Sequence, residues 1–353
     1  MSDATFRNSV LAAVAVGAIA VLLAVVGWTV FEFDPALVVY AQALIVSLSL
    51  TVYRFSIWLH RPPTLVLFRR SIQMAKRSNY VSLGKHLIFR CAEYFALNRF
   101  VWKRARNRWA AHWPIAIGCV MAMAIVVPLI FGWVWFETPA SDLHSYNVMV
   151  FGMHVRTIPI DGIEAFLMFH GLVWASFPVI VGTSFAMLRR MGDRGDRATQ
   201  TFGNDLVPLL LLQAISISGL LMTLSYSYFA GVWHRPLTIF HCVVVVGTVL
   251  WLPFSKLFHI PQRSLKLAQM IYEHESVKDG RANCMRCGNT FADQAQITDL
   301  IEIEQRLGYR YALEDGTHYQ SVCPPCRRAT MVLAQSKRWR NACSQKHAEQ
   351  QTV

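Results

Sequence analysis

The sequence predicts an all-α membrane protein, a bundle of about six transmembrane helices with a small α+β zinc-ribbon-like C-terminal domain. Three observations lead to this prediction. The 353 residues are 54% hydrophobic and 16% charged, whereas soluble domains carry about 25% charged residues. The apolar residues form unbroken runs long enough to cross a bilayer. From about Pro261 onward the composition becomes that of a soluble domain and includes two Cys-x-x-Cys motifs.

The six apolar runs are the expected spans, at about 9–31, 36–59, 113–136, 163–188, 205–229 and 237–259. No strongly basic stretch precedes the first run, no small-residue cleavage site follows it, and a second run comes at once, so we expect a retained helix and no signal peptide. The runs divide the chain into two N-terminal helices, a basic amphipathic segment, a four-helix core and the C-terminal domain, at 1–60, 61–110, 111–260 and 261–353.

The distribution of charge predicts the orientation. The net charge is +13, and residues 61–110 hold twelve Lys and Arg against one acid, Glu93. Basic loops between spans are typical of the cytoplasmic side and of contact with anionic membrane lipid. We therefore expect a multi-pass protein of the cell inner (cytoplasmic) membrane with both termini in the cytoplasm and no nucleic-acid partner. Apolar residues alternate with the bases of this segment, which favours amphipathic helices on the inner leaflet.

Four histidines within or at the ends of the spans are candidate ligands, because ionisable residues in spans are usually functional. His112 and His259 lie at the cytoplasmic side, and His170 and His241 toward the outer side. His241 and His259 are eighteen residues apart, so one continuous helix would present both on one face, about 27 Å apart. The matched depths pair His112 with His259 and His170 with His241, as axial ligands of two stacked haems. The alternative is that each is an interfacial residue hydrogen-bonded to lipid, water or backbone.

Several motifs resemble a known family over about residues 61–262. They are the segment Arg108–His112, "GTSFAMLRRM" at 182–191, "DLVPLLLLQAISISGLL" at 205–221 and "FHCVVVVGTVLWLPFSKLFH" at 240–259. The chain is similar there to the NarI-like membrane cytochrome b family, which includes the gamma subunit of respiratory nitrate reductase and heterodisulfide-reductase-type membrane cytochromes. The resemblance implies that His112 and His259 bind the haem b nearest the catalytic partner, and that His241 is one ligand of a second haem near the quinone site.

The chain departs from that family at the other ligand of the second haem. Where the family carries it on the third span, this chain has Ala122, which cannot bind a metal. We expect His170 in its place, with two alternatives: Met123 as a thioether ligand, or no second haem.

The function that the resemblance implies is electron transfer. The protein would be the haem b subunit of a respiratory oxidoreductase complex, passing electrons between the quinone pool and a cytoplasm-facing iron–sulfur or other oxidoreductase subunit. No catalytic side chain is expected, since the cofactor does the redox chemistry. The competing class is a non-redox membrane transporter, or a zinc-tailed membrane scaffold or sensor.

Four of the eight cysteines form a second candidate site. They are arranged as Cys284-Met-Arg-Cys287 and Cys323-Pro-Pro-Cys326. Two such motifs typically hold one tetrahedral metal ion, and disulfides are disfavoured in the cytoplasm. We expect a structural zinc, with iron or an iron–sulfur cluster as the alternative. The segment between the motifs is expected to hold a helix at about 294–306 and a short hairpin near Tyr309–Tyr319.

Overall fold

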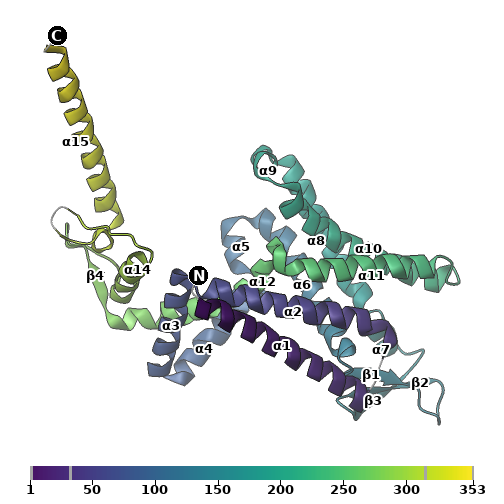
Figure 1. The fold of residues 1–353 in the computed structure, drawn as a ribbon. Coiled ribbons are helices and arrows are strands. Elements are labelled where there is room, and N and C mark those ends of the chain that lie inside the picture. Colours follow the sequence, from purple (N-terminus) through teal and green to yellow (C-terminus); the bar gives the residue numbers. More distant parts are fainter. Residues whose placement is uncertain (1–2, 32–33, 314–315, 352–353) are drawn as a thin grey trace. The chain divides into compact units, whose positions relative to one another are not determined.

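The computed structural model describes residues 3–31, 34–313 and 316–351, and only the backbone of residue 196 and of residues 339–351. It is mostly helical and divides into two compact units (Figure 1). Unit 1 comprises Met1–Trp58 and Cys91–Arg263, and unit 2 comprises Leu59–Arg90 and Ser264–Val353. The basic segment 61–110 is therefore shared: its first part folds with the C-terminal residues and its second part with the long apolar helices.

Among the residues that the structure describes, unit 1 contains six helices long and apolar enough to cross a membrane, which confirms the number predicted from the sequence. They are α1 (Asp3–Val30), α2 (Val38–Leu59), α6 (Arg106–Ile130), α8 (Gly171–Gly192), α10 (Val207–Tyr228) and α11 (His234–Trp251). Four shorter helices accompany them: α5 (Arg99–Arg104), α7 (Ile163–Phe169), α9 (Arg194–Thr199) and α12 (His259–Gln262).

A small antiparallel sheet lies at one end of the long helices of unit 1 (Figure 1). Its strands, in spatial order, are β1 (Val134–Glu137), β2 (Ser145–Val150) and β3 (Met153–Pro159). The third apolar run was expected to remain helical to residue 136, but α6 ends at Ile130 and the chain turns into β1. The sheet has its own core, in which Val148 and Ile158 pack against Ala165 of α7.

Helices α6 and α8 approach closely because glycines lie at their interface. A Cβ atom at Gly118 of α6 would lie 2.6 Å from the carbonyl oxygen of Ala175. One at Gly182 of α8 would lie 2.8 Å from the carbonyl oxygen of Ala111 and 2.7 Å from the Ile115 side chain. Small residues permit such backbone approach between membrane helices. This contact also fixes the backbone next to His112.

Replacing Gly182 by alanine is expected to weaken this interface. The added methyl group must displace backbone atoms of α6, and such overpacking costs about 1–3 kcal/mol. The measurement is the thermal unfolding midpoint of the purified protein in detergent. Gly247→Ala in α11 is the matched control, since a Cβ atom there meets nothing within 4 Å. Equal midpoints for the two variants would contradict the proposed close contact.

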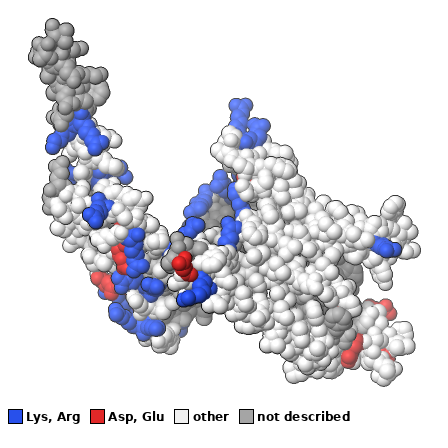
Figure 2. Space-filling model, in the orientation of Figure 1, with Lys and Arg blue, Asp and Glu red and all other residues white. Residues whose placement is uncertain are grey.

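Charge is unevenly distributed over unit 1. On the face shown in Figure 2 the long helices carry few charged residues, most Lys and Arg lie at the end where α5 and α9 are found, and Asp and Glu lie near the sheet at the other end. The basic end of unit 1 agrees with the basic segment 61–110 seen in the sequence.

Unit 2 is built around the packing of α3 against two C-terminal helices. Its elements are α3 (Pro62–Arg77), α4 (Tyr80–Cys91), α13 (Leu265–Glu275), β4 (Arg281–Asn283), β5 (Thr290–Asp293), α14 (Gln294–Arg306) and α15 (Pro324–Gln351). Arg70 of α3 pairs with Asp299 of α14 at 2.7 Å, and the Tyr272 hydroxyl donates to Asp299 at 2.8 Å. The Asp299 carboxylate raises the pKa of Arg70. Part of the segment predicted to lie on the inner leaflet thus packs on protein.

Candidate cofactor and metal sites

The structure brings His112 and His259 together, although they come from different helices of unit 1. Their ring centres are 6.4 Å apart with an angle of 65° between the ring planes. His112 lies in the second turn of α6, and His259 is the first residue of α12. The Nδ1 atom of His112 is buried and has no hydrogen-bond partner among the described residues.

The neighbours of His259 hold its ring in a defined orientation. Its Nδ1 atom lies 2.7 Å from the carbonyl oxygen of Lys256, so that a proton on Nδ1 leaves Nε2 free to bind a metal. The side chain of Lys256 pairs in turn with Asp205 at 2.6 Å, and Arg190 reaches the same carboxylate at 3.2 Å. Both cations thus share Asp205 as their partner in the structure.

A second anchor fixes the chain just beyond His259. The guanidinium of Arg263 donates to the Asn98 side chain at 2.8 Å and lies 4.7 Å from the centre of the Phe100 ring. Asn98 is buried with a positive φ of 48°, a conformation that asparagine tolerates better than most residues. Burial lowers the pKa of Arg263. Sequence reasoning missed this contact because it joins residues far apart in the chain.

The distance between the two ring centres is compatible with two imidazoles that would bind one metal ion from opposite sides. An imidazole nitrogen binds a transition metal at about 2.0 Å and lies about 1.1 Å from its ring centre, so the two ring centres would be about 6 Å apart. The observed 6.4 Å agrees with that value. If one nitrogen of each ring bound the same metal ion, each ring plane would contain its own metal–nitrogen bond. Any angle between the two ring planes would then be compatible with such binding.

One step of the sequence argument is wrong. His241 and His259 do not lie on one continuous helix, because α11 ends at Trp251. Pro253 lies in a short 3₁₀ helix, and Ser255 follows it with extended backbone at φ −91° and ψ 179°. The five-turn relation between the two histidines is therefore lost. His259 still reaches His112, since the broken helix end places it on a separate turn.

The outer histidines are not paired in the same way. His170 lies between α7 and α8, with Nδ1 2.8 Å from the carbonyl oxygen of Phe166. His241 packs against α10, with Nδ1 2.8 Å from the Ser218 hydroxyl oxygen. Within the described residues no ring contact or hydrogen bond joins His170 to His241. Met123 exposes 49% of its surface, so it is not enclosed by protein either.

His234 is a further candidate metal ligand, which the sequence analysis did not include. It lies seven residues before His241 on α11, two helical turns and so the same face. Its Nδ1 atom is buried without a partner among the described residues, and its ring centre is 6.4 Å from that of Tyr226. The seven-residue spacing was visible in the sequence and could have indicated it.

The four predicted cysteines of unit 2 form one cluster. Their sulfur atoms all lie within 4.8 Å of one another, and the Sγ atoms of Cys287 and Cys323 are 3.7 Å apart. Tetrahedral zinc with bonds of about 2.3 Å places its sulfurs about 3.8 Å apart. Cys284 and Cys323 are buried, Cys326 is half-buried and Cys287 is exposed. The residues thus fit a single tetrahedral metal ion.

Two different local structures supply these ligands. Cys284 and Cys287 lie in the turn between β4 and β5, where Gly288 adopts a φ of +74°. Cys323 and Cys326 lie at the start of α15, which begins with two prolines, residues well suited to a first helical turn. The predicted helix is confirmed as α14, Gln294–Arg306. Of the predicted hairpin, the described residues show one bridge, between Ala312 and His318. The second pair of ligands lies at the start of a helix and not in a turn between strands. In this respect the domain differs from the predicted zinc ribbon.

The surroundings of the cluster favour a negative sulfur at Cys284 and a protonated one at Cys326. The backbone amides of Arg286 and Cys323 donate to Cys284 Sγ at 3.4 and 3.2 Å. Burial opposes ionisation of this thiol, yet these amides bring the pKa of Cys284 down to about 6. A hydrogen bond with Cys323, burial and the other thiols raise the pKa of Cys326 to about 12. A divalent cation relieves this conflict, since it displaces the thiol protons.

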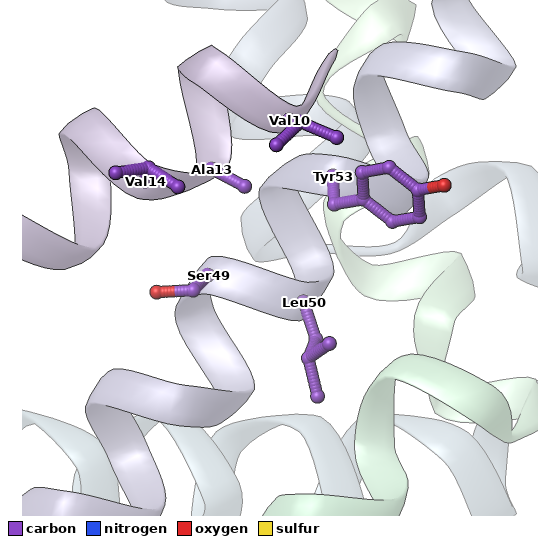
Figure 3. Close-up of a pocket in the computed structure, with 6 residues that line it drawn as sticks. All are labelled: Val10, Ala13, Val14, Ser49, Leu50 and Tyr53. Carbon is purple, nitrogen blue, oxygen red and sulfur yellow. The ribbon is translucent and has the colours of Figure 1, made fainter. Parts of the chain in front are cut away.

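An apolar groove between α1 and α2 is a separate feature. It has a volume of about 260 Å³, and its walls are Val10, Ala13, Val14, Ser49, Leu50 and Tyr53 (Figure 3). None of these side chains is a strong metal ligand. The groove is therefore no candidate for redox or metal chemistry.

Comparisons of the chain with models of protein families, with curated proteins and with solved structures find no match. The functional argument therefore rests on the residues and their geometry.

Proposed function

We propose that this protein is a haem b membrane subunit of an oxidoreductase complex, transferring electrons between the quinone pool and a cytoplasm-facing redox partner. The observation that carries the proposal is the His112–His259 pair, with ring centres 6.4 Å apart. His112 lies near the start of the apolar helix α6, and His259 lies a few residues beyond the last apolar helix. Helical bundles commonly bind haem between histidines of facing helices. When bound, the haem would supply one-electron redox chemistry.

The residues of the chain would position that group. His112 and His259 would be its axial ligands. Lys256, held by Asp205, orients His259 through its carbonyl group, and such outer hydrogen bonds fix the ring orientation and increase the basicity of the nitrogen that binds the metal. Arg263 would place positive charge beside the pair. A second haem at His241, with His170 or Met123 as its other ligand, has less support because no ring contact or hydrogen bond among the described residues joins His241 to either.

The six long helices would cross the cell inner membrane, with the basic end of unit 1 and both termini in the cytoplasm. Unit 2 would then be cytoplasmic, where the cysteine cluster would hold zinc. We favour zinc over iron or an iron–sulfur cluster because closed four-thiolate sites on a knuckle and a helix start are typical structural zinc sites. This unit is the proposed docking platform for the redox partner.

The test of the cytochrome proposal is the reduced-minus-oxidised spectrum of the full chain purified after haem-replete expression. We expect the absorption bands of a bis-histidine b-type haem. A preparation that is folded, judged by size-exclusion chromatography, and yet shows no haem bands would refute the proposal. That result would favour the competing class, a zinc-tailed scaffold or sensor or a transporter.

A further inference from the structure

Helix α4 of unit 2 packs on protein along one side. Leu83 is buried, and the ring of His86 stacks on that of His274 in α13 with centres 4.2 Å apart. Arg90, on the same side, pairs with Glu273 at 3.9 Å. This side of α4 therefore packs against other parts of unit 2.

The opposite side of α4 is apolar as well. Tyr80, Val81, Ile88 and Phe89 leave 71%, 69%, 74% and 68% of their surfaces exposed. At 100° per residue, Tyr80, Val81 and Ile88 fall within one arc of about 100°, and Phe89 lies about 80° beyond Val81, with Lys85 between them. A helix at the surface of a soluble unit normally turns polar residues outward. An exposed cluster of large apolar side chains indicates a binding surface.

Charge and chain connectivity indicate what covers this surface. Residues 61–90 contain seven Lys and Arg and no Asp or Glu. Of these bases, Lys76 and Arg77 at the end of α3 and Lys85 on α4 are exposed. The segment lies between two apolar helices, since α2 ends at Leu59 and α6 begins at Arg106. Apolar side chains bordered by bases, on a segment tethered between two spans, match the surface of an anionic bilayer.

We propose that α4 is an in-plane membrane anchor, which inserts Tyr80, Val81, Ile88 and Phe89 at the surface of an anionic lipid bilayer. Lys76, Arg77 and Lys85 would lie at the level of the lipid phosphates, while His86 keeps its contact with α13. The inference rests on the proposed insertion of the long helices in a membrane, but not on haem or zinc.

The test is site-specific photo-crosslinking of the full chain in lipid nanodiscs. p-Benzoylphenylalanine is incorporated at position 88, and adducts are identified by mass spectrometry. Position 22 in α1, also exposed, is the positive control for lipid contact. Position 305, exposed on α14 of the same unit, is the matched negative control. Discs of phosphatidylglycerol with phosphatidylcholine are compared with discs of phosphatidylcholine alone.

We expect lipid adducts at positions 88 and 22 and none at 305. The yield at position 88 should fall about fivefold or more for Lys85→Gln in anionic discs, the effect of one base at such a surface. Absence of lipid adducts at 88 while position 22 reacts would overturn the anchor, as would a cross-link from 88 to protein. Equal yields in both kinds of disc would overturn the preference for anionic lipid. Lipid adducts at neither 88 nor 22 would instead refute membrane insertion itself.

Discussion

Replacing Cys323 by serine is expected to remove the metal from unit 2 and to unfold the region around the cluster. Cys284 and Cys323 form, with Val322, the buried centre of this region, and among the described residues only Phe291, Leu313 and Cys326 pack against it. So small a core cannot fold alone, and structural zinc contributes on the order of 10 kcal/mol of folding free energy in such sites. We therefore expect the substituted protein to lose the metal and the fold of this region completely, and not by degrees.

Metal content and limited proteolysis of the full chain measure this effect. We expect one zinc per chain before substitution, none after it, and new cleavage between β4 and the start of α15. Cys91→Ser is the matched control, because Cys91 lies outside the cluster. Iron in place of zinc would identify the cluster as a redox centre. An unchanged cleavage pattern in a metal-free preparation would show that the cysteines do not hold a structural metal.

His259→Ala and His112→Ala are each expected to abolish haem binding at the His112–His259 site. Loss of one axial imidazole removes half of the protein's bonds to the metal, and the affinity should fall by more than the about 10- to 100-fold that changes in outer hydrogen-bond partners produce. Haem per chain, measured by the pyridine haemochrome assay, is the readout. His144→Ala is the control, since His144 is exposed in the loop before β2.

The same assay determines whether a second haem exists. If a second haem exists, His112→Ala and His259→Ala each keep one haem per chain. His241→Ala and His170→Ala then each remove that second haem. One haem per chain in the parent protein, unaffected by His170→Ala and His241→Ala, would restrict the cofactor to the His112–His259 site. Retention of full haem content in both His112→Ala and His259→Ala would contradict the assignment of that pair.

Local sequence patterns were sufficient to predict the cysteine ligands, the long helices and one pair of histidines. Each Cys-x-x-Cys motif brings two sulfurs together within one turn, and two such motifs in one small domain were enough to predict that the two pairs would meet in one cluster. Uninterrupted apolar stretches likewise predicted six long helices, since length and hydropathy are properties of the segment itself. Matched positions at helix ends also predicted that His112 and His259 would meet.

Tertiary structure decided what depends on backbone breaks and distant contacts. The extended backbone at Ser255 ends the helical relation between His241 and His259, and no periodicity in an apolar run reports such a break. The Asp205–Lys256 and Asn98–Arg263 contacts join separate elements, so no local pattern contains them. Of the sheet in unit 1, β1 overlaps an apolar run that was expected to be helical, and β2 and β3 lie between that run and the next. A short apolar stretch suits a helix or a strand equally well, and in the structure Val148 and Ile158 of the sheet pack on α7.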